Sequence, residues 1–416
     1  MFNQLFNQSK ARRRYQNAPL LEERLRYLAY RSDQGIKRSL LREIASYQLI
    51  LVKKLSLKKN KIITIEEINY IAHRWAVYSL RHSHFKNISC TSREERFIRY
   101  AIRWLSFLGR LEIPQPPPMP IQIIDFADYM RNEKGLGESW INRICQFEQD
   151  FFSQFKKDIN HTLAHLTPDR LDKLLIKEFN KQAYSHRTIQ LIAGKLRVFL
   201  RYAETRGWCH PELADSIKIP RSYKHQILPM SPSWEDVQQL LKTTEGNLPW
   251  NIRARAILLL LAVYGLRDSE LRRLRFDDFD WNEGIFHIKR SKFGPTQKFP
   301  LVQTVGRALV RYIKKVRPRS SAHQEIFLTI QPPFRPLNSL FYIVNRRWKL
   351  LDVAIKHHGP HALRHACATR LINQGMSLKT IADHLGHRDL DTTRVYAKVD
   401  LSSLRKVANF SIGGLL

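Results

Sequence analysis

A short segment, Gly359-Pro360-His361-Ala362-Leu363-Arg364-His365, concentrates chemistry-bearing side chains, and Leu385-Gly386-His387 and Tyr396 follow it closely. Imidazole, guanidinium and phenol groups suit a phosphodiester substrate, because guanidinium binds non-bridging oxygens, imidazole moves protons and phenol can be a nucleophile. His361 and Arg364 are three residues apart and therefore share one face of a predicted helix. Such a pair alone is more often structural than catalytic, so its role depends on the rest of the chain.

The composition predicts a large folded protein with a polyanionic partner. The chain has 416 residues, 43% of them hydrophobic, which indicates two or three domains with proper cores and excludes a disordered chain. Lys and Arg number 70 against 37 Asp and Glu, giving a formal charge of +33. Neutralising phosphates with such an excess releases condensed counterions and gives strong binding. Nucleic acid is therefore the leading interpretation, and a merely basic or ribosome-associated protein is the alternative.

The sequence predicts a cytoplasmic, nucleoid-associated bacterial protein that does not enter a membrane. Residues 1–16 contain no apolar core of a secretory signal. The longest apolar run, Ala256–Tyr264, is about half the length of a membrane span and is predicted to be a buried helix. Widely spaced cysteines indicate reduced thiols of an intracellular protein. These are Cys90, Cys145, Cys209 and Cys367.

No metal and no cofactor is expected. The histidines of residues 357–365 could suggest a metal site, but His361-Ala362-Leu363-Arg364-His365 lacks the Glu of an H-E-x-x-H motif. No Cys or carboxylate lies at ligand spacing from them. The usual Gly-rich motifs that bind nucleotide phosphates are also missing from the sequence.

Proline and charge patterns divide the chain into segments. Five prolines between residues 114 and 120 favour an extended spacer, because proline cannot continue a helix. Residues before the spacer read as basic helices, for which DNA contact and protein contact both remain open. The predicted segments are an N-terminal basic helical domain at 1–112, a Pro-rich linker at 113–120, a helical domain at 121–220, a linker at 221–230, a third domain at 231–402 and a C-terminal tail at 403–416.

The helical domain at 121–220 contains a basic helix face. Ser185 is predicted to begin a helix with an apolar face on one side and cations on the other. Arg187 and Lys195 belong to the cationic face. In so basic a chain they either contact DNA phosphates or simply solubilise the helix.

The third domain is predicted to be mainly helical with a small β-hairpin. Ser231–Asp236 carries helix-start signals, and Gly265 ends the buried helix. Ile285–Ile288 and Lys298–Leu301 read as two strands joined by a Gly-Pro turn.

Further candidates for the phosphate site lie in this domain. Arg267 follows the end of the buried helix, and Glu270 could hold its guanidinium in place. Lys292 lies at the hairpin. His387 lies in a loop after a predicted helix, and Tyr396 follows nine residues later.

Taken together, these segments resemble the tyrosine site-specific recombinases of the phage integrase family. They occur in the order and at the spacings typical of that family over residues 231–400. Residues 121–220 resemble its helical core-binding domain more loosely, and residues 1–112 match nothing that can be carried over. The matching stretches are GLRDSELRRL (265–274), KRSKFGPTQKFPL (289–301), HALRHACATRLINQG (361–375), LKTIADHLGH (378–387) and DTTRVYAKV (391–399).

The resemblance implies a role for six residues. Tyr396 is implied to be the nucleophile that forms a 3′-phosphotyrosyl link and releases a 5′-hydroxyl. Arg267 and Arg364 are implied to bind the non-bridging oxygens. His361 and His387 are implied to transfer protons. Lys292 is implied to be the general acid, with Lys289 and Lys298 as rivals; its eight-residue spacing to Pro300 matches the family hairpin best.

The resemblance also implies an architecture and partners. The fold would be mainly α with a small β-hairpin or sheet, a multi-domain DNA clamp made of a SAM-like core-binding domain and an α+β catalytic domain. Double-stranded DNA with specific recombination sites, a homo-tetramer, a tail that contacts another subunit, and accessory DNA-bending or partner recombinase proteins are implied. The activity would be that of an integrase or transposase. The alternatives are a non-catalytic DNA-binding protein with this fold and DNA relaxation of the type IB topoisomerase kind.

Overall fold

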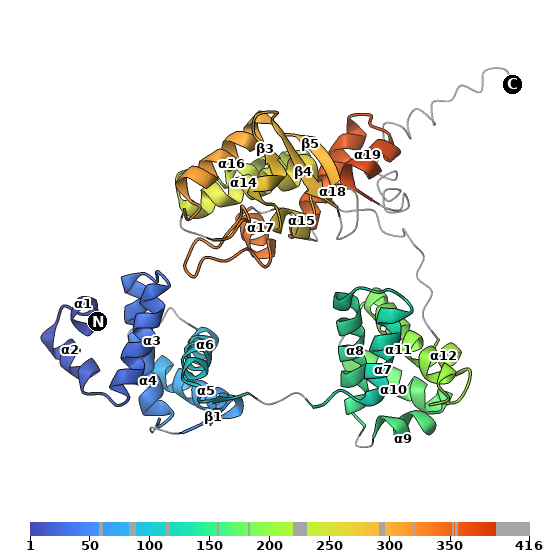
Figure 1. The fold of residues 1–416 in the computed structure, drawn as a ribbon, viewed down its shortest axis with the longest axis horizontal. Helices are drawn as coiled ribbons and strands as arrows, with labels where there is room; N and C mark the ends of the chain where they lie inside the picture. The colour runs from blue at the N-terminus through green and yellow to red at the C-terminus, as the bar shows by residue number, and fades with distance from the viewer. Residues whose placement is uncertain are drawn as a thin grey trace. The chain divides into compact units, whose positions relative to one another are not determined.

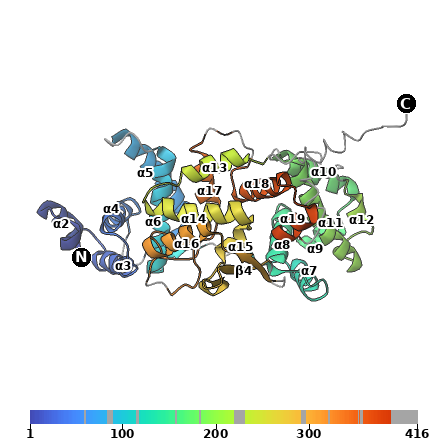
Figure 2. The same cartoon turned by 90° about the horizontal axis from the view of Figure 1, so that it is seen from above.

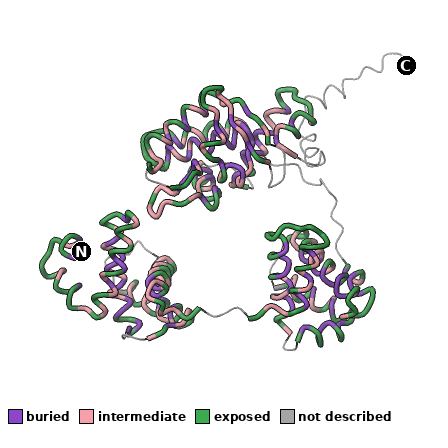
Figure 3. The backbone as a smooth tube through the Cα atoms, viewed as in Figure 1, coloured by how far each residue is buried: buried purple, intermediate pink, exposed green. Residues whose placement is uncertain are grey.

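The protein consists of two compact units with separate buried cores. The units are Met1–Ile113 with Ile227–Leu416, and Pro114–Gln226. Figure 3 shows buried segments inside each part, and nearly all regular structure is helical, which confirms the predicted mainly α fold. Within the described part of the chain, no helix is long and apolar enough to cross a membrane. The computed structural model describes residues 1–57, 61–82, 89–113, 117–155, 158–181, 184–218, 231–290, 296–319, 322–351, 353 and 357–387.

The N-terminal part is a group of helices around an apolar core that includes Phe97 and Trp104. Helix α6 begins after Ser89, whose side chain accepts from the backbone N of Ser92, and ends at Gly109 with φ of +66°. The two short strands pair in parallel. The elements are α1 (Phe2–Leu5), α2 (Ser9–Gln16), α3 (Leu21–Asp33), α4 (Arg38–Lys54), β1 (Ile63–Thr64), α5 (Ile65–His82), α6 (Cys90–Leu108) and β2 (Leu111–Glu112) (Figure 1).

All regular secondary structure in the described residues of the second unit is helical. Ser185 caps its longest helix by accepting from the backbone N of Thr188 at 3.2 Å, as the sequence predicted. Phe126 and Phe199 meet edge to face in its core, with ring centroids 5.2 Å apart. The elements are α7 (Ile121–Asn132), α8 (Glu138–Ser153), α9 (Ile159–Ala164), α10 (Pro168–Lys181), α11 (His186–Thr205) and α12 (Leu213–Ser216).

The C-terminal part combines helices with a three-stranded antiparallel sheet of order β3-β4-β5. The predicted hairpin is present, with Phe286 opposite Phe299 in the register. The elements are α13 (Trp234–Lys242), α14 (Pro249–Tyr264), α15 (Asp268–Arg272), η1 (Phe276–Asp278), β3 (Phe279–Asp280), β4 (Ile285–Lys289), β5 (Thr296–Pro300), α16 (Gln303–Lys315), α17 (Phe341–Trp348), α18 (Pro360–Asn373) and α19 (Leu378–Leu385).

Helix α14 is the centre of this part. Its second half, Ala256–Tyr264, is apolar on all sides, and the helix contacts α13, α15, α16, α17 and α18 (Figure 2). Its last residue, Tyr264, donates through its hydroxyl to the carbonyl oxygen of Pro300 at 2.8 Å and accepts from the backbone N of Val302 at 2.8 Å. The end of α14 is therefore fixed to the end of β5. Gly265 then ends the helix with φ of +61°, a left-handed conformation that glycine adopts without steric cost.

Candidate active site

Arg267 is held by Glu270 and by a distant backbone carbonyl. Its backbone N donates to Oε2 of Glu270 at 2.8 Å, and its Nη1 donates to Oε1 of the same carboxylate at 2.7 Å. Its Nη2 donates to the carbonyl oxygen of Gly386 at 2.7 Å. The carboxylate of Glu270 is fully buried, whereas the Arg267 side chain remains 31% exposed. The guanidinium is thus fixed at its inner side and open to solvent on its outer side.

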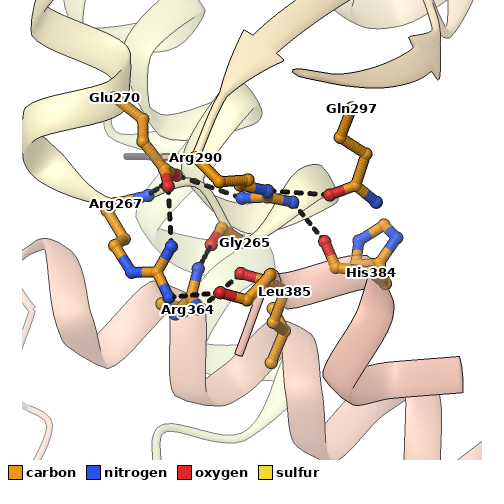
Figure 4. Close-up of polar contacts among 9 residues, drawn as sticks. Gly265, Arg267, Glu270, Arg290, Gln297, Arg364, His384 and Leu385 are labelled. Atoms are coloured by element: carbon orange, nitrogen blue, oxygen red, sulfur yellow. Dashed lines mark hydrogen bonds and ion pairs between the residues drawn. The ribbon is translucent and has the colours of Figure 1, made fainter. Parts of the chain in front are cut away.

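Arg364 is the second guanidinium of the site and is buried on α18. Its Nη1 donates to the carbonyl oxygen of Gly265, and its Nη2 donates to that of Leu385 at 2.7 Å. Figure 4 shows Arg364 and Arg267 reaching toward the same end of α19 from different elements. Backbone carbonyls hold these two cations close together although their charges repel each other. This arrangement is suited to one shared anion.

Two glycines make this close approach possible. Gly265 and Gly386 both have left-handed backbones, with φ of +61° and +64°. A Cβ atom at Gly265 would lie 2.6 Å from Cδ2 of Leu385. A Cβ atom at Gly386 would lie 2.6 Å from Cδ of Arg290. Only glycine satisfies both the backbone conformation and the space at these positions.

Burial favours the neutral form of the histidines of the site. His361 lies one helical turn before Arg364, and burial, followed by the charge of Arg364, lowers its pKa. His387 follows α19, and burial, followed by the charges of Arg364 and Arg267, lowers its pKa to about 4. Burial also lowers the pKa of His365 to about 4. Neutral imidazoles can donate an N–H hydrogen bond to a phosphate oxygen without adding charge.

The structure brings four of the six predicted catalytic residues into one site. Arg267, Arg364, His361 and His387 come from the turn before α15, from α18 and from the loop after α19, and they influence one another electrostatically. Lys292 and Tyr396 lie outside the described residues.

The two residues predicted to bind DNA lie in the other unit, on α11. Arg187 is exposed. Lys195 is half-buried, with its Nζ 5.0 Å from the ring centre of Phe147.

Sequence reasoning missed Arg290. This side chain is 6% exposed and donates to Glu270 Oε2 at 3.1 Å. A signal was present in the hairpin pattern, since Phe286 and Ile288 face the core and Arg290 continues the same alternation. A buried cation directly after the end of β4 requires a buried acceptor, and Glu270 supplies it.

Within the described residues, no group of three or more His, Cys, Asp or Glu side chains is placed to hold a metal ion.

The chain is similar to several known recombinases. Residues 233–402 match the profile described as the phage integrase family. A putative integrase/recombinase of Sinorhizobium fredii, y4rF, is 32% identical over 308 residues, which are 72% of this chain and 72% of that protein. Tyrosine recombinase XerD of Listeria innocua is 29% identical over 299 residues, which are 68% of this chain and 96% of that protein.

Solved recombinase structures share the fold. The XerH site-specific recombinase bound to difH substrate has a TM-score of 0.51 at 17% identity and covers 85% of this chain and 98% of its own. The Tn1549 transposon integrase in complex with transposon right-end DNA has a TM-score of 0.52 at 18% identity and covers 69% of this chain and 99% of its own. With the identity and coverage of its curated relatives, the chain belongs to the phage integrase family and is a tyrosine site-specific recombinase.

Proposed function

We propose that this recombinase breaks and rejoins double-stranded DNA at specific sites through a 3′-phosphotyrosyl intermediate on Tyr396. The observation that carries the proposal is the pair of guanidiniums fixed to one turn, Arg267 on the carbonyl of Gly386 and Arg364 on that of Leu385. Two cations so placed suit the two non-bridging oxygens of a scissile phosphate. The charge that develops on those oxygens in the transition state would be offset without movement of the protein.

The proposed reaction is a transesterification. The phenolic oxygen of Tyr396 forms a bond to phosphorus as the bond from phosphorus to the 5′ oxygen breaks. Lys292 gives its proton to the leaving 5′ oxygen, and His361 and His387 donate to the phosphate or move the phenolic proton. The phosphodiester energy is kept in the tyrosyl link, so attack by another 5′-hydroxyl reverses the step without ATP. The unperturbed phenol has a pKa near 10, and attack on a phosphate bound by Arg267 and Arg364 would bring it near two cations that favour the ionised form.

DNA is the proposed partner of both units. The formal charge of +33 supports a polyanion, and the similar XerH and Tn1549 structures are complexes with DNA. We assign residues 121–220 to a core-binding domain and residues 231–402 to the catalytic domain. The linker at 221–230 joins these two domains, and the linker at 113–120 precedes the first of them. Four strand exchanges require a homo-tetramer on two sites, with the tail at 403–416 contacting a neighbouring subunit. Accessory DNA-bending proteins and a nucleoid location in the cytoplasm complete the proposal.

Replacement of the nucleophile tests this function. The target is first found by mapping covalent cleavage on DNA that flanks the gene, and a nicked suicide version of it then traps the intermediate. We expect Tyr396→Phe to retain DNA binding and to lose the covalent adduct. Tyr342→Phe is the matched control, because Tyr342 is a tyrosine on α17 that is 80% exposed. This variant should form the adduct at the parental rate. An undiminished adduct with Tyr396→Phe would overturn the proposal, and relaxed circles without recombinant junctions would favour a topoisomerase activity.

A further inference from the structure

We propose that Arg290 is a positioning residue for recombination: a buried cation that fixes the β-hairpin and the end of α19 around Glu270, and so places Arg267 and Arg364 for phosphate binding. The inference rests on the proposed function and extends it to a residue outside the six described above. It concerns how the phosphate site is held rather than which groups react.

Arg290 has a contact on every side of its guanidinium. Its Nε donates to Oε1 of Gln297, across the hairpin, at 2.7 Å. Its Nη1 donates to Oε2 of Glu270 at 3.1 Å, and its Nη2 donates to the carbonyl oxygen of His384. The guanidinium also lies 5.1 Å from the ring centre of Phe299 on β5. Figure 4 shows the group extended between Glu270 on one side and Gln297 and His384 on the other.

These contacts converge on the anchors of the two phosphate-binding arginines. Oε2 of Glu270 accepts from Arg290 and from the backbone N of Arg267, and Oε1 accepts from the Arg267 guanidinium. The His384 carbonyl immediately precedes those of Leu385 and Gly386, which accept from Arg364 and Arg267. One guanidinium therefore contacts Glu270, which holds Arg267, and the residue directly before Leu385, which holds Arg364. Loss of Arg290 would remove one of the bonds that hold the last turn of α19 and would leave Glu270 with a single cation.

The local packing leaves little room for an alternative arrangement. A Cβ atom at Gly386 would lie 2.6 Å from Cδ and 2.7 Å from Nε of Arg290. The side chain of Arg290 is 6% exposed and that of Glu270 is fully buried, so water cannot readily replace the lost bonds. A displacement of about 1 Å in such a site is enough to cost roughly 100-fold in rate.

A second buried arginine provides the matched control. Arg347 on α17 is 7% exposed. Its Nη1 donates to the carbonyl oxygen of Thr243 at 2.8 Å, and its Nη2 donates to Oδ1 of Asn251 at 2.7 Å. Neither of these two contacts involves the residues that anchor Arg267 or Arg364. Arg347→Gln thus removes a comparable buried cation away from the site.

The test compares cleavage of two suicide substrates by the full chain. One carries the natural scissile phosphodiester, and the other a methylphosphonate, in which a methyl group replaces a non-bridging oxygen and removes the negative charge. We expect Arg290→Gln to lower single-turnover cleavage of the phosphodiester by about 10- to 100-fold, with the DNA Kd changed less than about threefold. On the methylphosphonate, the decrease in cleavage rate caused by Arg290→Gln should be below about threefold, because cleavage of a neutral group depends little on the positions of nearby cations. Arg290→Lys should recover part of the activity, and Arg347→Gln should show equal deficits on both substrates.

A milder variant covers the case in which Arg290→Gln fails to fold. Gln297→Leu keeps the guanidinium and removes only its bond across the hairpin, so it should show a smaller deficit that is again reduced on the methylphosphonate. Equal deficits on both substrates, or no deficit in either variant, would overturn the positioning role. A parental chain that forms no Tyr396 adduct on the phosphodiester would instead overturn the proposed function, and this inference with it.

Discussion

The guanidinium of Arg267 donates to the carbonyl oxygen of Gly386 at 2.7 Å, although 119 residues separate the two in the chain. Arg364 makes the equivalent bond to Leu385, the residue before Gly386. Both phosphate-binding candidates are therefore positioned by one turn at the end of α19. Because groups of the protein itself hold both guanidiniums, the site has little to reorganise during the reaction, which is the condition for strong electrostatic stabilisation of a transition state.

The close approach at Gly265 predicts a specific effect of adding one methyl group. In Gly265→Ala, the left-handed backbone costs about 1–2 kcal/mol, and the new Cβ atom also collides with Leu385, 2.6 Å away. Movement of Leu385 would shift the carbonyl that holds Arg364, so we expect adduct formation to slow by at least about tenfold. Single-turnover cleavage and calorimetric melting of the full chain measure the two effects.

Gly284→Ala is the control for this substitution. Gly284 has a nearly identical φ of +62°, but a Cβ atom there would meet nothing within 4 Å. It should show the backbone cost alone and the parental cleavage rate. Equal loss of activity in the two variants would contradict the steric explanation.

Helix ends and the hairpin could be predicted because their signals are local. Ser185 and Gly265 act within one turn of their own helices, and the structure places the corresponding helix ends at these residues. The alternation in Ile285–Lys289 likewise depends only on neighbouring residues. Arg267 and Arg364 could be named because they lie in motifs, but the carbonyls that hold them could not.

The role of Arg290 could not be predicted for a related reason. Its burial is implied by strand alternation, but its acceptors depend on folding. Glu270 is 20 residues away and the carbonyl of His384 is 94 residues away. No periodicity in one sequence reports a pairing across such separations, and a backbone carbonyl leaves no mark on residue type at all.

The buried imidazole of His387 predicts a pH dependence of stability. Its pKa in the folded chain is about 4, lowered by burial and then by the charges of Arg364 and Arg267, whereas unfolded His titrates near 6.5. Between these values the unfolded chain binds a proton that the folded chain does not, so stability is lost as pH falls from about 6.5 toward about 4. Above about pH 6.5 this group contributes no slope.

His387→Gln removes this group and tests the assignment. We expect the melting temperature of the variant to fall less than that of the parent between about pH 7 and about pH 5. The comparison with the parent cancels other groups, such as Glu148, whose burial raises the pKa of its carboxyl and acts in the opposite sense. Parallel melting profiles would show that His387 titrates normally in the folded chain.

The basic face of α11 predicts a change in the salt dependence of DNA binding. If exposed Arg187 neutralises a phosphate, Arg187→Gln should reduce the slope of log Kd against log salt by about 0.9, because one fewer counterion is released. Lys195→Gln should change the slope in the same direction and by no more than this, because its ammonium already lies 5.0 Å from the ring centre of Phe147. Fluorescence anisotropy on the mapped site measures both slopes.

Arg131→Gln in the same unit is the control. The guanidinium of Arg131 is paired with Asp128 at 2.5 Å and with Glu138 at 2.6 Å, so its loss should leave the slope unchanged. Slopes for Arg187→Gln and Lys195→Gln that match the parent would mean that this face only solubilises the helix, and the DNA would then have to bind the unit through other cations.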